Sequence, residues 1–291
     1  MVRWIFEGNT KFTEYEEQQI KEFYKHLEKK FIAFPQEWLS VKHNSLKFLH
    51  ANQWNFDKAV KTIQEYLDWR KKNLPVNING KIHDFLDSGI IYVHGRDNRF
   101  RPILVLNTYK LDPKNVNLET TLESITYFLT YVIENLLLPG QVENWVIIQD
   151  MGKMGITELP LKMLKTVMDF LQNNFRARLY KMYAVNAPST IYWGFKLVKP
   201  LLEETTANKI HFTKEGVNEE MWTHINKTQV EKRFGGNAEN NEKFWPPQFP
   251  SEQYFLENEK PEDFLVSKDE YKKRYQEGQL TGKKVDPSIA S

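Results

Sequence analysis

The sequence of 291 residues predicts an α/β protein: a mostly parallel sheet with helices packed around it, preceded by a small all-helical module. Two observations predict this fold. From about residue 100 onward, short and nearly continuous apolar runs alternate with longer amphipathic runs, which is typical of parallel strands joined by helices. Before about residue 75, the apolar residues recur only at helical spacing.

The helical module, assigned to residues 1–78, contains three expected helices. The first begins at Thr13, which with Glu16 three residues later forms a capping-box pattern. The second covers the stretch SVKHNSLKFLHAN, and the third follows Asn55, the expected N-cap. Pro75 comes directly after this third helix and is typical of a helix end.

The α/β region, assigned to residues 79–236, contains four apolar runs bounded by turn residues, which we expect to be strands. These runs are RPILVLN (101–107), WVIIQD (145–150), KMYAVN (181–186) and KIHF (209–212). Helices are expected between them, at 119–138, at 158–174 and in the stretch before the last strand.

The C-terminal extension, assigned to residues 237–291, is polar and rich in proline and then in lysine and glutamate. We expect it to be partly disordered, because it has few apolar residues to bury. Phe244, Trp245 and Phe249 are the side chains expected to anchor its first part.

Composition argues against several classes of function. The 40 basic and 38 acidic side chains leave a net charge of +2, which gives no support to nucleic-acid binding. The absence of cysteine excludes disulfides, cysteine-ligated zinc and thiol nucleophiles. No G-x-S-x-G, H-E-x-x-H or phosphate-loop motif is present, and the seven histidines are scattered. We therefore expect no catalytic residues, no metal and no enzyme activity, and we expect Asp150 to cap a turn.

The stretch from about 189 to 204 is amphipathic in an unusual way. Ile191, Phe195 and Val198 share one apolar face, whereas Lys196 and Lys199 lie opposite, with Trp193 at the boundary. Ordinary core packing explains the apolar face, but it does not explain the aromatic ring beside the two lysines. Aromatic rings beside lysines are also typical of a membrane interface, so contact with a membrane is the second reading.

The ordered motifs of the chain resemble those of the CRAL-TRIO family of lipid-transfer proteins. The helical segment LKFLHANQWNFDKAVKTIQEYLDWRKK resembles the family's N-terminal module. RPILVLN, WVIIQDMGKMGI, YAVNAP, LVKPLLEETTANKI and KRFGG then follow in the family's order and spacing. The resemblance covers about residue 40 to residue 236 and rests on the whole ordered set.

This resemblance implies a sheet that floors a hydrophobic cavity, one bound lipid in place of a cofactor, and a movable gate helix at about 189–204. It also implies a cytoplasmic, peripherally membrane-associated protein, expected to be a monomer, that carries lipid between membranes. Ile191, Trp193, Phe195 and Val198 would belong to the gate. The side chains expected to line the cavity are Tyr127, Tyr131, Trp145, Ile147 and Gln149.

The headgroup positions of the family are only partly retained. Phosphoinositide-binding members carry a basic pair where this chain has Asn52 and Gln53, and a glutamate where it has Ala177. Trp145 and Ile147 stand where the family holds a phosphocholine phosphate with Ser and Thr. The retained candidates for contact with a headgroup or an anionic lipid, possible phosphoinositides included, are Arg178, Lys181, Thr206 and Lys209.

Two cargoes therefore remain open. One is an apolar lipid under Trp145 and Ile147, because a buried phosphate without polar partners is costly. The other is a phospholipid held by a different polar set that includes Gln149, Tyr127 and Tyr131. A scaffold or regulatory module that senses lipid and binds a protein partner is the alternative function, and an enzyme is a further rival without a supporting motif.

Overall fold

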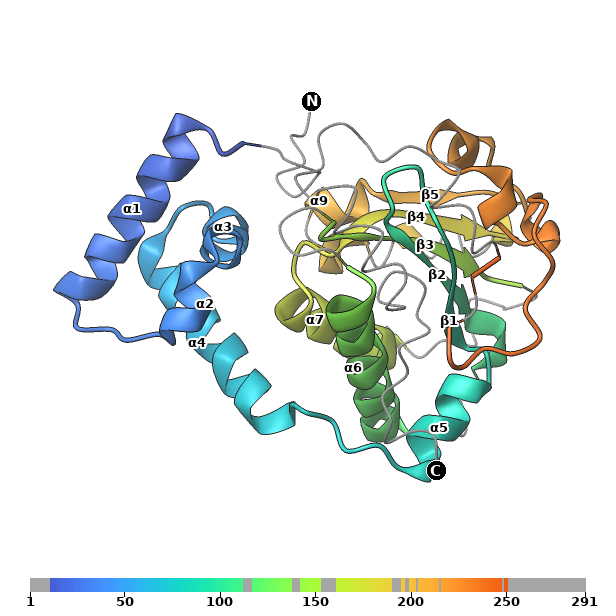
Figure 1. Cartoon of the computed structure of the whole chain (residues 1–291), viewed down its shortest axis with the longest axis horizontal. Helices are drawn as coiled ribbons and strands as arrows, with labels where there is room; N and C mark the ends of the chain where they lie inside the picture. The colour runs from blue at the N-terminus through green and yellow to red at the C-terminus, as the bar shows by residue number, and fades with distance from the viewer. Residues whose placement is uncertain are drawn as a thin grey trace, which may run out of the picture.

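The computed structural model of the protein describes residues 11–111, 117–137, 142–152, 161–189, 195–196, 199–202, 204–214, 216–247 and 249–250. Figure 1 shows two parts, a group of helices at the N-terminal end of the described chain and a twisted sheet with helices against it. Within the described ranges, no helix combines the length and the apolar character needed to cross a membrane.

The helical module has its own core. Its helices are α1 (Glu14–Lys29), α2 (Gln36–Ser40), α3 (Lys42–Ala51) and α4 (Phe56–Asn73). The expected capping box is confirmed, since the Thr13 hydroxyl accepts from the Glu16 amide and the Glu16 carboxylate accepts from the Thr13 amide. Asn55 caps α4, also as expected. The interior is formed by buried apolar side chains, among them Ile20, Phe23, Leu46, Leu49 and Ile63.

The sheet confirms the α/β prediction. Five strands lie in sequence order in the described part of the chain, with β1 antiparallel to β2 and the other neighbours parallel. The strands are β1 (Ile91–Arg96), β2 (Pro102–Asn107), β3 (Trp145–Asp150), β4 (Leu179–Val185) and β5 (Ile210–Phe212). The last four coincide with the expected strands to within two residues.

The strand β1 and the helix before it, α5 (Gly80–Asp87), were not among the expected elements. The sequence of β1 ends in His94, Gly95 and Arg96, which makes it look like a polar turn. The structure buries these residues and satisfies Arg96, whose guanidinium Nη1 donates to the carbonyls of Phe100 and Leu136.

Helices cover one face of the sheet, which we call the inner face, and short 3-10 turns cover the outer face. Residues of α6 (Leu118–Asn135) and α7 (Leu161–Asn174) share the inner cluster with Leu104 and Trp145. The 3-10 helices on the outer face are η4 (Glu219–Thr223), η5 (Lys227–Gln229) and η6 (Lys232–Phe234). Met221 in η4, Phe234 in η6 and Val230, which directly follows η5, belong to the outer cluster. The remaining short helices are η1 (Thr108–Lys110), η3 (Lys199–Leu201) and α9 (Glu204–Ala207).

A buried polar network holds the carboxyl ends of the central strands on the outer face. Arg233, in η6, donates to the Tyr92 hydroxyl and the Asn107 side-chain oxygen at 2.6 and 3.1 Å. Its guanidinium also pairs with Asp150 and Glu231. Asp150 accepts from the Gly152 amide, which confirms its expected role as a cap of the turn.

The first part of the C-terminal extension is anchored by the three expected aromatic residues. Trp245 packs edge-on against both Tyr127 and Tyr131 in α6. Phe244 lies beside Tyr92, and Phe249 lies under the Arg96 guanidinium. Residues 251–291, for which partial disorder was expected, lie outside the described residues.

Candidate functional site

The candidate site begins in β3, where exposure alternates with the pleat of the strand. Val146 and Ile148 are 0% and 1% exposed and belong to the outer cluster. Ile147 and Gln149 point to the inner face and are only half-buried. Trp145, at the start of the strand, is buried among inner-face residues of α6 and α7.

The same face continues across the two neighbouring strands, where Met182, Ile210 and Phe212 are half-buried and Ala184 is fully buried. Met182 pairs with Ile147 and with Ile210, and Ala184 pairs with Gln149 and with Phe212. Since partners in register share a face, these side chains extend one surface across the parallel strands. We call this surface the inner row: Ile147, Gln149, Met182, Ala184, Ile210 and Phe212.

The sequence predicted Ile147 and Gln149 of this row, together with the buried Trp145, as cavity residues, but it missed Met182, Ile210 and Phe212. Alternation with a period of two along the expected strands could have pointed to every second residue as a lining candidate. The register between strands, which aligns Met182 with Ile147, has no signal in a single sequence.

One polar group stands in the inner row. The Gln149 amide nitrogen donates to the Thr108 hydroxyl at 2.7 Å, which fixes the side chain at the carboxyl end of β3. The side-chain oxygen is a hydrogen-bond acceptor by its chemistry. An apolar surface with a single polar group suits a largely apolar ligand.

The described part of the expected gate lies against the end of the inner row. The ring of Phe195 packs on Phe212, with 4.7 Å between the ring centroids. Lys196 and Lys199 are exposed and border a depression of about 400 Å³ together with Pro200 and Leu202. Ile191, Trp193 and Val198, which were expected in the same gate, lie outside the described residues.

Tyr127 and Tyr131, expected to line the cavity, are covered by the C-terminal extension. Their ring centroids lie 5.9 and 4.8 Å from that of Trp245, and both side chains are buried. Burial raises the pKa of the Tyr131 hydroxyl to about 12. The two rings therefore pack with Trp245 in the buried inner cluster and are not part of the inner row.

The basic residues expected at the rim are divided between the two faces. Lys181 in β4 pairs in register with Val146, an outer-cluster residue, and its ammonium forms an ion pair with Glu220 of η4 on the outer face. The Lys209 ammonium donates to the Leu179 carbonyl at 2.7 Å. Thr206, in α9, is half-buried. Arg178 and Lys209 thus stay near each other, whereas Lys181 does not join them.

Arg178 takes part in an ion cluster that links the helical module to the sheet. Its guanidinium and the Lys47 ammonium of α3 share the carboxylate of Glu143, and all three side chains are largely buried. Burial and the nearby charge of Arg178 lower the pKa of Lys47 to about 8. The cluster connects residues that are far apart in sequence, so no local sequence motif predicts it.

The positions that depart from the phosphoinositide pattern have structural roles here. The Asn52 amide donates to the Phe48 carbonyl and the Thr62 hydroxyl within the helical module. Ala177 adopts a left-handed backbone conformation with φ 57°, and its carbonyl accepts from Asn144. Gln53 is exposed and also has a positive φ, of 52°.

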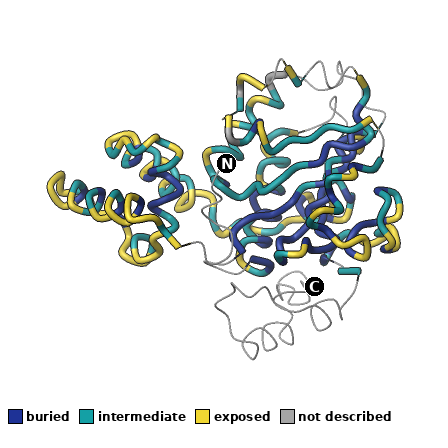
Figure 2. Tube along the Cα trace, turned by 90° about the horizontal axis from the view of Figure 1, so that it is seen from above, coloured by how far each residue is buried: buried dark blue, intermediate teal, exposed yellow. Residues whose placement is uncertain are grey.

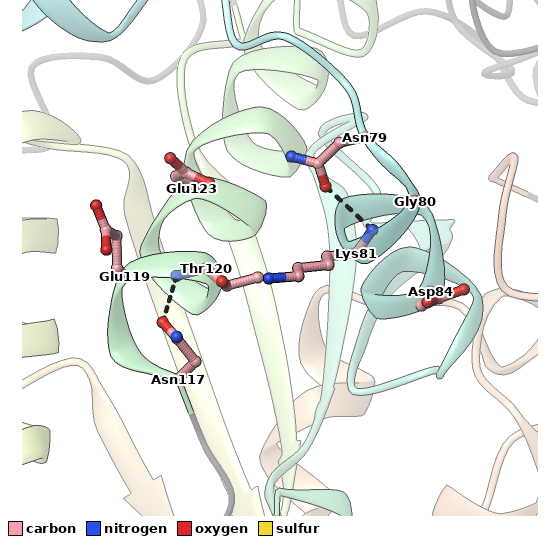
Figure 3. A pocket seen from close by; sticks show the side chains of 8 residues that line it. All are labelled: Asn79, Gly80, Lys81, Asp84, Asn117, Glu119, Thr120 and Glu123. Atoms are coloured by element: carbon pink, nitrogen blue, oxygen red, sulfur yellow. Dashed lines mark hydrogen bonds between the residues drawn. The ribbon is translucent and has the colours of Figure 1, made fainter.

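A second depression, of about 620 Å³, lies between the beginnings of α5 and α6. Figure 3 shows its side chains, with Asn79 and Asn117 each capping a helix and Lys81 extending between them toward Thr120. Its lining is polar and includes Asp84, Glu119 and Glu123, which makes it unsuited to a lipid tail.

The comparisons with known proteins agree with this architecture. The model of the CRAL/TRIO domain matches residues 86–236, more than half of the chain. The protein therefore belongs to the CRAL/TRIO domain family, as the ordered motifs predicted. A crystal structure of Sfh5 matches with a TM-score of 0.62 and 16% identity, over 80% of this chain and 91% of that one, which supports the fold.

Two curated relatives are similar to about two thirds of this chain. The Sec14 cytosolic factor of Schizosaccharomyces pombe is 24% identical over 67% of this chain and 74% of its own length. The phosphatidylinositol/phosphatidylcholine transfer protein SFH9 of Arabidopsis thaliana is 25% identical over 67% of this chain and 37% of its own length. Apart from Sec14, the chain spans between 20% and 53% of the length of the other curated relatives compared with it.

Proposed function

We propose that this protein holds one lipid molecule against the inner row and transfers it between membranes. The observation that carries the proposal is the half-buried state of Ile147, Met182, Ile210 and Phe212 on one face of three adjacent parallel strands, β3 to β5. Parallel sheets normally have both faces covered, and apolar side chains on them are then sealed from water. A lipid tail would complete the burial that the protein itself leaves unfinished.

The segment around 189–204 would act as the gate over this surface. Phe195 packs on Phe212 at the end of the inner row, while Lys196 and Lys199 are exposed beside it. In the closed state, Phe195 would shield the apolar surface from water. At a bilayer, it would move away and contact acyl chains, and the lysines would face lipid phosphates.

The cargo favoured by the polar groups is a lipid without a tightly held phosphate. Asn52 is engaged with Phe48 and Thr62, and Ala177 offers no side-chain donor or acceptor. Arg178 and Lys209, which could hold a phosphate, already bind Glu143 and the Leu179 carbonyl. The alternative cargo is a phospholipid, the class of lipid that the name of the SFH9 relative gives.

Native mass spectrometry of the mildly purified protein tests the proposal directly. We expect one bound lipid of a few hundred daltons per chain. A transfer assay between liposomes should show that Phe195→Asp lowers the rate at least about tenfold, because a charge would have to be buried in the closed gate or inserted into the bilayer.

Phe195→Leu is the matched control, since it keeps an apolar side chain against Phe212 and should retain most of the transfer rate. A protein that purifies empty and moves no lipid between liposomes would refute the proposal. Equal transfer by Phe195→Asp and wild type would refute the gate alone.

A further inference from the structure

Phe31 is 96% exposed, the highest value among the large hydrophobic side chains of the described residues. It follows the last turn of α1, and Figure 1 shows this end of α1 at the outer end of the helical module, where the chain turns back toward α2. Figure 2 shows that the outer end of this module is mainly exposed.

The backbone holds Phe31 outward in a conformation that its side chain disfavours. The Phe31 amide donates to the Glu28 carbonyl and the Ile32 amide to the Leu27 carbonyl, which is a Schellman motif at the end of α1. Phe31 has a φ of 55°, the left-handed position that usually belongs to glycine. Because Ile32 packs against the helical core, the turn is fixed and the ring of Phe31 is left in water.

The surroundings of Phe31 are basic. Lys25, Lys29 and Lys30 lie exposed in the last two turns of α1 or directly after it. The acidic neighbours are Glu28 and Asp57, and Asp57 is paired with both Lys30 and His26. Lys58, which follows Asp57, is also exposed. The four lysines therefore outnumber the two carboxylates around Phe31.

We propose that this tip, formed by Lys29, Lys30, Phe31 and Ala33, docks onto an anionic membrane surface. Phe31 would enter the interfacial layer while the lysines approach lipid phosphates. The other exposed large hydrophobic side chains of the described residues are Tyr15, Val41 and Tyr109, and none belongs to the tip. One aromatic ring in a basic rim is too little apolar area for a stable protein interface, but it suits a membrane.

The contact is separate from the proposed gate and does not depend on lipid exchange. It would add a second point of attachment, carried by the helical module. Membrane binding by the gate could therefore persist when the tip is altered, so a test needs a signal that arises at the tip itself.

The chain contains no cysteine, which permits a single local probe. Ala33→Cys, labelled with the environment-sensitive fluorophore NBD, keeps Phe31 and reports on the tip. We expect a blue shift and a rise in emission with phosphatidylcholine vesicles that contain phosphatidylserine, and no change with phosphatidylcholine alone. Adding Phe31→Gly to the labelled protein should weaken the response about tenfold in vesicle concentration.

Phe31→Gly separates docking from folding, because glycine suits the left-handed turn and should leave thermal stability equal or higher. Lys29→Glu should weaken the response by a similar factor at low salt and less at high salt. Tyr15→Ala, which removes an exposed aromatic ring from the opposite end of α1, should leave the response unchanged.

Absence of a fluorescence change with phosphatidylserine vesicles would overturn the proposal. A response that survives Phe31→Gly unchanged would overturn it as well. Lipid occupancy in native mass spectrometry should be the same in Phe31→Gly as in wild type, so failure of the tip and failure of lipid carriage give different results.

Discussion

Ile147 and Ile148 are neighbours in β3, yet one is half-buried on the inner face and the other is sealed on the outer face. The outer face is closed by 3-10 turns and by the polar network around Arg233. The inner face keeps an apolar row that no comparable set of side chains closes within the described residues. Both faces contain a buried cluster, but the apolar side chains of β3 are covered completely only on the outer face.

The largest effect should come from breaking the outer network at Arg233. Arg233→Met removes the cation that neutralises Glu231 and Asp150, of which Glu231 is 1% exposed. A buried carboxylate that loses its partner costs about 4 kcal/mol, so urea denaturation should show a loss of that order. Adding Glu231→Gln should recover part of it, and a double variant no more stable than Arg233→Met would contradict this reason.

The neighbouring isoleucines test the comparison most directly. Ile148→Ala should lower the free energy of unfolding by about 3 kcal/mol, because it leaves a cavity in a sealed core. Ile147→Ala should cost less, about 1 to 2 kcal/mol in the lipid-free protein, because its side chain is only partly buried. Urea denaturation of both variants after removal of lipid is the measurement, and equal losses would mean that the two faces do not differ as described.

A third effect, smaller than those expected for Arg233→Met and Ile148→Ala, is a pH dependence that arises on the outer face. Burial, with the charges of Lys181 and Arg101, lowers the pKa of His224 to about 4, from an ordinary value of 6.5. The folded protein thus holds His224 neutral while the unfolded chain takes up a proton near pH 6.5. Stability from this group is present above pH 6.5 and is lost as the pH falls toward 4, by about 2 kcal/mol between pH 7 and pH 5.

His224→Gln should flatten this pH dependence, with unfolding in urea measured at pH 7 and pH 5. His94 is also buried with a lowered pKa, so part of the slope should remain. His83→Gln, at an exposed position of α5, should leave the slope as in wild type. A slope that His224→Gln does not change would show that the outer face is more open to water around His224 than described.

Prediction from the sequence succeeded where a signal is local. The apolar runs predicted β2 to β5, and the capping residues Thr13 and Asn55 marked the beginnings of α1 and α4. It failed for β1, since the buried Arg96 and His94 resemble turn residues until their distant partners Leu136 and Asn241 are known.

The candidate site shows the same division. Trp145, Ile147 and Gln149 could be placed on one face because they alternate within one strand. Met182, Ile210 and Phe212 depend on the register between strands, and Arg178 depends on Glu143, which lies 35 residues away. Lys181 was grouped with Arg178 as a candidate headgroup contact, but Lys181 pairs with Glu220 on the outer face, whereas Arg178 pairs with Glu143.

The packing of Trp245 against Tyr127 and Tyr131 bears on where this domain ends. The match to the family model stops at residue 236, but the hydrophobic interior continues through Trp245, and Asn241 and Phe244 also contact β1. The region that matches the family is therefore shorter than the region that forms the hydrophobic core. A protein cut after residue 236 would keep every family motif and still lose part of its core.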